Sequence, residues 1–116
     1  MFERAQDLDV VLVSVGDMGT QGTAYRYDFV PEVVRSSMVQ QGAVGEILFN
    51  YFDAQGKGIK HPIEQCVMSV PLSTLSSAKH RVISSGGVAK AAALLGALRG
   101  ATPTALITDE HAARKV

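Results

Sequence analysis

Residues 81–99, RVISSGGVAKAAALLGALR, constrain the fold of this chain more than any other segment. A β-branched run leads through two glycines, Gly86 and Gly87, into a stretch rich in alanine and leucine. β-Branched residues favour strands, glycine pairs favour turns, and alanine and leucine favour helices. The segment therefore predicts a strand that turns directly into a helix.

A lysine, Lys90, follows this glycine turn near the predicted start of the helix. The first turn of a helix carries unpaired backbone N–H groups and a partial positive charge, so a cation there opposes the local field. A phosphate or carboxylate that joins the Lys90 ammonium to the N–H groups near Gly86 and Gly87 would explain this placement. The alternative is a solvated surface lysine, because lysines are mostly exposed.

The charge balance argues against direct recognition of nucleic acid. The 116 residues include 11 lysines and arginines and 11 aspartates and glutamates, so any contact with DNA needs another domain. No apolar run approaches the ~20 residues of a membrane span, and the first residues lack the features of a signal peptide. We therefore expect a cytoplasmic protein that does not contact a membrane.

The single cysteine, Cys66, cannot form an internal disulfide, which fits a reducing compartment. Its apolar neighbours predict a packing role, as for most buried free cysteines. His61, His80 and His111 do not share the spacing of zinc ligands, and the chain has no cysteine cluster or GxSxG motif. The sequence thus predicts neither a metal site nor another cofactor.

Apolar runs and helix signals alternate along the chain. Strands are expected at residues 10–15, 47–52, 67–70, 82–84 and 105–107. Helices are expected at residues 29–41, 72–77 and 88–98, and a last helix follows Thr108 or Asp109, both candidate caps. Asp28 is the predicted N-cap of the first helix, and residues 53–58 have the composition of a turn. The alternation predicts an α/β fold, with a partly parallel sheet flanked by helices.

Ligands of such sheets bind outside the carboxyl ends of the strands. Three loops are expected there, at residues 16–26, 86–90 and 108–110. The first loop, GDMGTQGTAYR, matches neither the dinucleotide-binding motif nor the P-loop. It is either a flexible polar loop or a ligand lid, in which Thr20 or Thr23 binds hydroxyls and Arg26 pairs with an anion.

Glu46 comes directly after a glycine turn and before an apolar strand. A carboxylate in this place can accept hydrogen bonds from two adjacent hydroxyls of a sugar. The alternative is an exposed charge at the end of a strand. Asp53, in contrast, is best explained as a turn residue.

Four motifs in one order, GAVGEI, FDAQG, SSGGVAKAAALLGALRG and ALITDEHAA, follow an upstream DVVLVSVG. Together they resemble the C-terminal half of the effector-binding domain of the SorC family, which are DeoR-like bacterial transcriptional regulators that respond to sugars. The resemblance covers nearly the whole chain. Regulators of autoinducer-2 uptake, which respond to a phosphorylated quorum-sensing sugar, are among the members that it resembles.

The resemblance implies a fold similar to that of sugar-phosphate isomerases and coenzyme A transferases. In that family a phosphorylated sugar binds at the strand ends and changes how a homo-oligomer holds operator DNA. The acidic residue of the family's GAVG-D/E motif falls on Glu46, and the lysine after its double glycine falls on Lys90. Both are expected to face the hydroxyls or the carbonyl end of the ligand, and Arg26 corresponds to a basic position that contacts it.

Two parts of the family pattern have no counterpart in this sequence. They are the N-terminal helix-turn-helix and a glycine-threonine loop that resembles the main phosphate cradle. We therefore expect residues 1–116 to form a single, incomplete sugar-binding domain, with exposed sheet edges where further strands would pair. Operator DNA would then be bound only through a domain outside these residues.

Two functions of different kinds follow from these residues. The favoured function is a non-catalytic sensor, which binds a sugar without converting it and shifts the equilibrium between two states of an oligomer. The alternative is an enzyme related to sugar-phosphate isomerases or deaminases, with Glu46 as the general base and Lys90 stabilising an enediolate. A third reading is an inert fragment.

Overall fold

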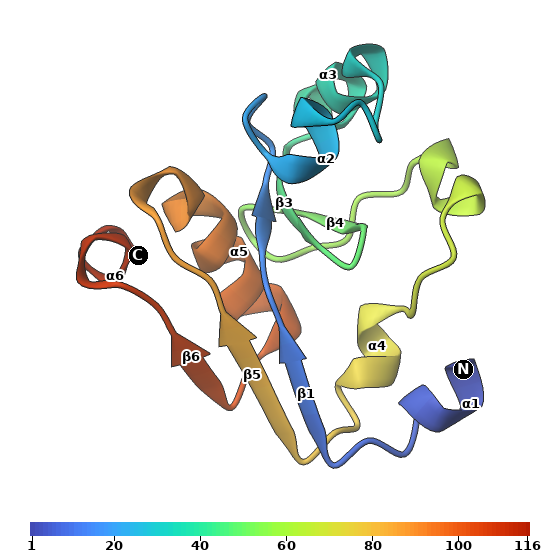
Figure 1. The fold of residues 1–116 in the computed structure, drawn as a ribbon, viewed down its shortest axis with the longest axis vertical. Helices are drawn as coiled ribbons and strands as arrows, with labels where there is room; N and C mark the ends of the chain where they lie inside the picture. The colour runs from blue at the N-terminus through green and yellow to red at the C-terminus, as the bar shows by residue number, and fades with distance from the viewer.

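The computed structural model describes residues 1–116 and contains two three-stranded sheets (Figure 1). The first sheet is parallel, with the strand order β1 (Val10–Val13), β5 (His80–Ser84) and β6 (Ala105–Ile107). The second is antiparallel, with the order β2 (Gly16–Asp17), β3 (Ala43–Ile47) and β4 (Asn50–Asp53). Only Ser14 and Val15 separate β1 from β2, so one continuous stretch of chain takes part in both sheets.

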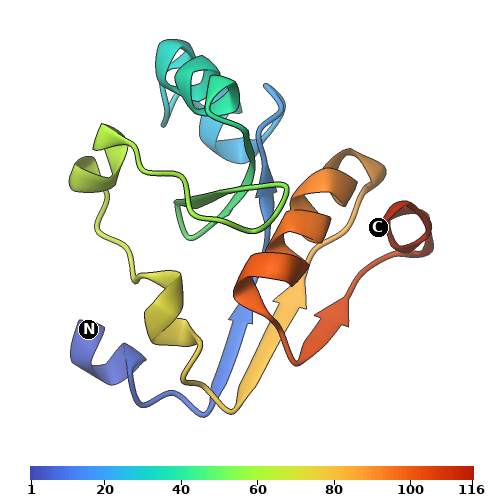
Figure 2. The same ribbon diagram turned by 180° about the vertical axis from the view of Figure 1, so that it is seen from behind.

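Helices connect and flank these strands. The α-helices are α1 (Phe2–Ala5), α2 (Thr23–Arg26), α3 (Glu32–Gln40), α4 (Leu72–Leu75), α5 (Ala91–Ala101) and α6 (Glu110–Lys115). Two short 3-10 helices are η1 (Pro62–Cys66) and η2 (Val88–Lys90). α5 connects β5 to β6 and lies in front of the parallel sheet in Figure 2. The expected α/β class, a partly parallel sheet flanked by helices, is confirmed.

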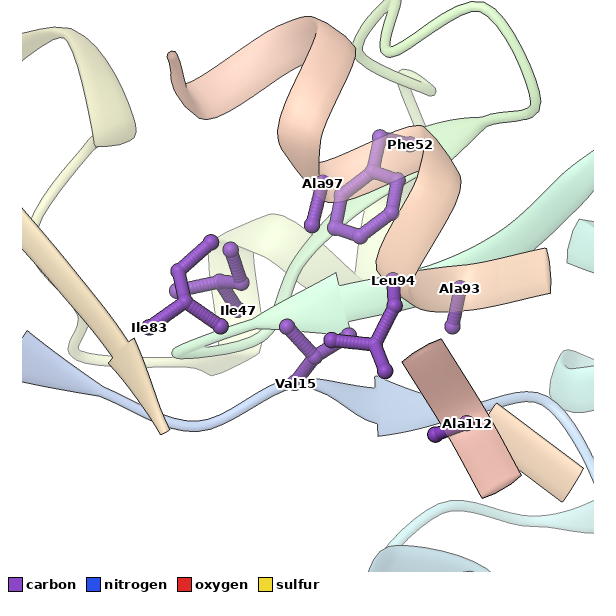
Figure 3. Packing of buried hydrophobic residues seen from close by; sticks show 8 residues of the cluster. All are labelled: Val15, Ile47, Phe52, Ile83, Ala93, Leu94, Ala97 and Ala112. Carbon is purple, nitrogen blue, oxygen red and sulfur yellow. The ribbon is translucent and has the colours of Figure 1, made fainter. Parts of the chain in front are cut away.

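The main hydrophobic core lies between the parallel sheet, the β3–β4 hairpin and α5 (Figure 3). Its buried side chains are Val15, Ile47, Phe52, Ile83, Ala93, Leu94, Ala97 and Ala112. The connections from β1 to β5 and from β5 to β6 move across the sheet in the same direction. Right-handed crossovers that move in one direction fall on one face of a sheet, which explains why the hairpin and α5 share a face.

The opposite face of the parallel sheet carries apolar side chains that nothing in the chain covers. Val10, Leu12 and Ile107 lie there, and 57%, 67% and 58% of their respective surfaces are exposed. Side chains alternate between the two faces of a strand, and Val11 and Ile83 on the other face are buried. The chain therefore covers one face of a sheet type that is usually covered on both.

α5 rests on the β3–β4 hairpin through contacts that only glycines permit. A Cβ atom at Gly45 would come 2.6 Å from the Cβ of Ala93, and one at Gly100 would collide with the backbone of Gly56. Closely packed backbone has little freedom to shift. The first contact fixes the start of α5 against β3, and the second fixes its end against the turn that follows β4.

The single strand predicted at residues 47–52 is wrong, because two residues within it form a tight turn. β3 ends at Ile47, β4 begins at Asn50, and these two residues pair with each other. Leu48 and Phe49 between them have φ angles of 51° and 60°. Two-residue hairpin turns with positive φ favour Asn-Gly, so a Leu-Phe pair gives no turn signal in the sequence.

Two expectations for the following segment are also wrong. Residues 67–70 pair with no strand, and the Val70 carbonyl instead accepts a hydrogen bond from the Asn50 side chain at 3.0 Å. Cys66 lies exposed at the end of η1 and has no packing role. In Figure 1 the yellow-green segment lies outside both sheets, and Val70 at its end packs beside a small cluster that includes Val11 of β1.

The N-terminal half contains the expected elements with shifted ends. The strand predicted at residues 10–15 ends at Val13. α3 begins at Glu32, and its N-cap is Pro31 rather than Asp28, whose φ of 56° lies in the left-handed region. The turn at residues 53–58 is confirmed, because an Asp53 carboxylate oxygen accepts from two N–H groups further along it, each at 2.9 Å.

The C-terminal half follows the prediction more closely. β5 and α5 form the expected strand, glycine turn and helix, with η2 as the first turn and the helix extended to Ala101. β6 coincides with residues 105–107. Asp109 caps α6, since its carboxylate accepts from the Ala112 N–H at 2.9 Å. None of the helices has the length and apolar character that a membrane crossing requires.

Candidate functional site

A cavity of about 290 Å³ opens where β1 passes into β2. β2 and β3 supply one side of it, the segment that leads into α2 supplies another, and the end of η2 supplies a third. The lining residues are Ser14, Val15, Gly16, Asp17, Gln21, Gly22, Thr23, Ala24, Tyr25, Glu46 and Lys90. Most of them are polar, and the cavity lies beyond the carboxyl end of β1, where ligands of such sheets bind.

Glu46 is held in this cavity by its backbone neighbours. It lies opposite Gly16 in the pairing of β2 with β3. Its Oε2 accepts a hydrogen bond from the Phe49 N–H at 2.6 Å, and its Oε1 lies so close to Gly16 that a Cβ atom there would collide with it. The glycine leaves room for the carboxylate, and the hairpin turn supplies a donor that orients it.

Burial raises the pKa of Glu46 above its usual range. The hydrogen bond from Phe49 and the charge of Lys90 lower it again, but only in part. A carboxyl group in this state gains from any further donor, because hydrogen bonds to the ionised form replace the water that burial removes. A hydroxyl group of a bound ligand is such a donor.

Lys90 is the last residue of η2 and lies half-buried on the cavity wall. Glu46 feels its charge, but no ion pair within 4.0 Å joins the two side chains. The structure therefore brings Glu46 and Lys90 to one cavity, as the sequence predicts, but does not pair them with each other. A ligand that lies between them could accept a hydrogen bond from the ammonium and donate one to the carboxylate.

Gly86 and Gly87 do not line the cavity. The Gly87 N–H donates to the Asp109 carboxylate at 2.5 Å, and a Cβ at Gly86 would come 2.5 Å from the same carboxylate. The hydrogen bonds from Ala112 and Gly87 lower the pKa of Asp109. An anion does occupy the glycine turn as the sequence predicts, but it is a side chain of the protein itself.

Arg26 also stays outside the cavity. It ends α2 and is exposed, and its guanidinium carbon lies 5.8 Å from the centre of the Tyr27 ring. Thr23, one of the two threonines suggested as hydroxyl contacts, lines the cavity, whereas Thr20 does not. The segment at residues 16–26 therefore forms a wall of the cavity, with Arg26 on its outer side.

Sequence reasoning missed several lining residues, among them Ser14, Asp17, Gln21 and Tyr25. Asp17 reaches the site because β2 pairs with β3, a two-residue contact without any hydrophobic pattern in the sequence. Tyr25 is buried, and burial raises the pKa of its hydroxyl above the usual range. For Gln21, the only sequence signal of a place in the site was that a polar residue lies in a candidate ligand loop.

The donor and acceptor set suits a small polyhydroxylated molecule. Carboxylate oxygens accept from hydroxyls, while the ammonium, amide and hydroxyl groups of the wall donate to carbonyl, hydroxyl or ether oxygens. No group of three histidine, cysteine, aspartate or glutamate side chains is arranged to hold a metal ion. The volume is close to the lower end of the range for small-molecule sites.

The family to which this fold and cavity belong follows from comparison with known proteins. The family model described as "Putative sugar-binding domain" matches residues 1–116, and the chain belongs to that family. This agrees with the resemblance to the SorC family that the sequence motifs indicate.

Individual relatives are transcriptional regulators. The chain is 28% identical over 114 residues to the deoxyribonucleoside regulator of Bacillus subtilis (strain 168), covering 98% of this chain and 36% of that protein. It is 33% identical over 115 residues to the transcriptional regulator LsrR of Escherichia coli (strain K12), covering 97% and 36%. The chain thus spans about a third of the length of these curated relatives.

A solved structure supports the same assignment. It is described as the putative SorC family transcriptional regulator from Enterococcus faecalis, and it is 28% identical to this chain with a TM-score of 0.76. The match covers 98% of this chain and 44% of the other. The fold described above is therefore the fold of part of a SorC-family regulator.

Proposed function

We propose that this chain is the effector-sensing unit of a bacterial transcriptional regulator and that it binds a phosphorylated sugar without converting it. The observation that carries the proposal is the open cavity in which Glu46 and Lys90 face the same space without pairing. Membership of the sugar-binding domain family supports the ligand class, and the regulator relatives support the role.

In this proposal each residue of the site has a defined task. Glu46 accepts hydrogen bonds from sugar hydroxyls through its Oε1, because Oε2 is already engaged by Phe49. Lys90 donates to a carbonyl or hydroxyl oxygen at the other end of the same cavity. Arg26, exposed at the end of α2 outside the cavity, offers its guanidinium to a phosphate that projects beyond the cavity wall. Gly86 and Gly87 contribute by shaping the turn that presents Lys90, since the Gly87 N–H belongs to Asp109.

We also propose how binding reaches DNA. With 11 basic and 11 acidic residues the chain has no basic field of its own, so operator DNA is bound by a different domain of the regulator. The sugar acts by binding one state of a homo-oligomer more tightly than the other, which shifts the population of the state that binds DNA. This function places the protein in the cytoplasm.

The relatives named above are regulators, and an enzymatic role has no comparable support. The sensor predicts binding without turnover, and the enzyme predicts that the sugar phosphate is consumed.

Thermal unfolding with a panel of pentose and hexose phosphates, each beside its unphosphorylated counterpart, tests the proposal. A ligand at about 100 times its Kd stabilises the folded state by about 2.7 kcal/mol, which raises Tm by several degrees. We expect one sugar phosphate to do this and Lys90→Ala to abolish the effect. Lys115→Ala, at the exposed end of α6, is the matched control.

Two results would contradict the proposal. One is the absence of any Tm increase across the panel, and the other is an equal increase in the Lys90→Ala variant. Analysis of the sugar phosphate after incubation separates the two functions, because only an enzyme changes it. Formation of a product would favour the isomerase or deaminase function over the sensor function.

A further inference from the structure

The turn between β3 and β4 combines two features that rarely occur together. It has only two residues, Leu48 and Phe49, and both have positive φ angles, 51° and 60°. L-residues with side chains such as these avoid this region, because Cβ crowds the backbone. A turn of this shape is readily made by Asn-Gly, so the Leu-Phe pair is held there by its surroundings.

This turn directs a backbone donor into the candidate site. With Phe49 in the left-handed conformation, its N–H points back along the hairpin and reaches Glu46 Oε2 at 2.6 Å. The opposite oxygen of the same carboxylate lies against Gly16. The orientation of Glu46 therefore depends on the shape of the turn that follows it.

The Asn50 side chain makes three of the hydrogen bonds that hold the turn from outside. Its Nδ2 lies 3.0 Å from the Ile47 carbonyl oxygen, 3.2 Å from that of Leu48 and 3.0 Å from that of Val70. The two protons of the amide thus tie both sides of the turn to the extended segment at residues 67–70. Ser69 adds to this bracing, because its hydroxyl donates to the Leu48 carbonyl.

We propose that Asn50 is a positioning residue for Glu46 and acts through the backbone of Leu48 and Phe49. The inference rests on the proposed function in one respect, since Glu46 is the carboxylate assigned to the sugar hydroxyls. Asn50 itself does not line the cavity. Its role is to keep the Phe49 N–H on Oε2, which leaves Oε1 as the free acceptor for a ligand.

NMR titration of the ligand-free chain tests this role. The Glu46 carboxyl carbon reports its pKa, and the Phe49 amide proton reports the hydrogen bond, because its resonance shifts when the carboxyl group titrates. In Asn50→Ala we expect the pKa of Glu46 to rise further and the pH dependence of the Phe49 resonance to be lost. Gln55→Ala, which removes an exposed amide from the next turn, is the control and should leave both unchanged.

A rescue variant separates positioning from a general loss of structure. Leu48→Asn with Phe49→Gly supplies a pair that adopts positive φ readily, while residue 49 keeps its N–H. Added to Asn50→Ala, this pair should restore the wild-type pKa of Glu46 and the pH-dependent amide resonance at residue 49. If Asn50→Ala alone fails to fold, the variant that carries all three substitutions is compared with the wild type in the same way.

Two outcomes would overturn the proposal. One is an Asn50→Ala variant with the wild-type titration of Glu46, and the other is a folded rescue variant in which that titration remains shifted. Neither measurement requires a ligand. Failure of the sugar-binding proposal would therefore leave these results interpretable, and failure here would leave the sugar-binding test intact.

Discussion

Two glycine-rich strand ends of this molecule look alike in the sequence and differ in the structure. One follows β1 at Gly16 and the other follows β5 at Gly86 and Gly87. The first opens into a cavity with an incompletely satisfied carboxylate, Glu46. The second is closed by the carboxylate of Asp109, which the Gly87 N–H contacts.

The difference arises from the neighbours of each strand. β5 is the central strand of the parallel sheet, and the adjacent β6 ends beside it and delivers Asp109 to the glycine turn. β1 is an edge strand, and its extension pairs with β3, which brings Glu46 beside Gly16. Both strand ends therefore hold a carboxylate of the protein itself, and the fold decides whether that carboxylate closes the strand end or faces an open cavity.

The largest effect on this comparison is expected from Gly16→Ala. The added methyl group collides with Glu46 Oε1 and displaces the carboxylate, so the open site should lose its ligand-binding geometry. We expect Kd for the sugar phosphate to rise more than tenfold, whereas stability should change little, because the clash is with the movable end of the Glu46 side chain. Ligand titration and thermal unfolding measure the two effects. Gly58→Ala, where a Cβ meets nothing within 4 Å, is the control; an equal response in both variants would contradict the assignment.

Asp109→Ala removes the carboxylate that closes the strand end after β5. The substitution frees the Gly87 N–H and removes the cap of α6, so Tm should fall by about 5 °C. Because the wild-type pKa of Asp109 is lowered, its stabilisation is present above its ordinary pKa of 3.8 and is lost as pH falls through the folded value. Unfolding from pH 7 downward should thus show the two proteins converging. Glu110→Ala, which removes an exposed partner of Arg114, is the control, and a response equal to that of Asp109→Ala would count against the capping role.

The open site should titrate with the opposite sign. The pKa of Glu46 is raised, so the folded state binds its proton more tightly than the unfolded state and the ionised carboxylate costs stability. This loss of stability is absent below pH 4.5, the ordinary pKa of a glutamate. It grows as the pH rises from 4.5 to the pKa of Glu46 in the folded state, and above that pH it stays constant. Glu46→Gln should therefore be more stable than wild type at pH 7, with no gain in stability at low pH. A variant that is less stable at pH 7 would refute this account.

The smallest effect is expected from Arg26→Ala. Arg26 is exposed and lies outside the cavity, so stability should change by less than about 0.5 kcal/mol. If its guanidinium meets a phosphate that projects beyond the cavity wall, Kd for the sugar phosphate should rise while binding of the unphosphorylated sugar stays the same. Arg4→Ala in α1 provides the comparison. An equal rise in Kd for both sugars would show that Arg26 does not recognise the phosphate.

Those parts of the fold that have strong local signals could be predicted from the sequence. The strand, glycine turn and helix around Gly86 follow from composition, and the Asp109 cap follows from its position before α6. The turn at Leu48 and Phe49 could not be predicted, because its conformation is held by Asn50 and Ser69 against the preference of its own residues. Tertiary contacts outweighed local propensity there.

The candidate site divides in the same way. Glu46 and Lys90 were predicted and one cavity contains both, although Glu46 lies within β3 and not after a glycine turn as expected. The hydrogen bond between Gly87 and Asp109 was not predicted, because Asp109 is 22 residues further along the chain. Asp17 was not predicted either, since it reaches the cavity through the pairing of β2 with β3.

The glycine contacts between α5 and the β3–β4 hairpin have a consequence for how a ligand fits. Gly45 against Ala93 and Gly100 against Gly56 bring backbone so close that neither element can move toward the other. Glu46 lies in β3 and Lys90 immediately precedes α5, so we expect the wall that they form to be organised before a ligand arrives. We expect adjustment to ligands of different size to come from residues 21–25, which line the cavity from the segment that leads into α2.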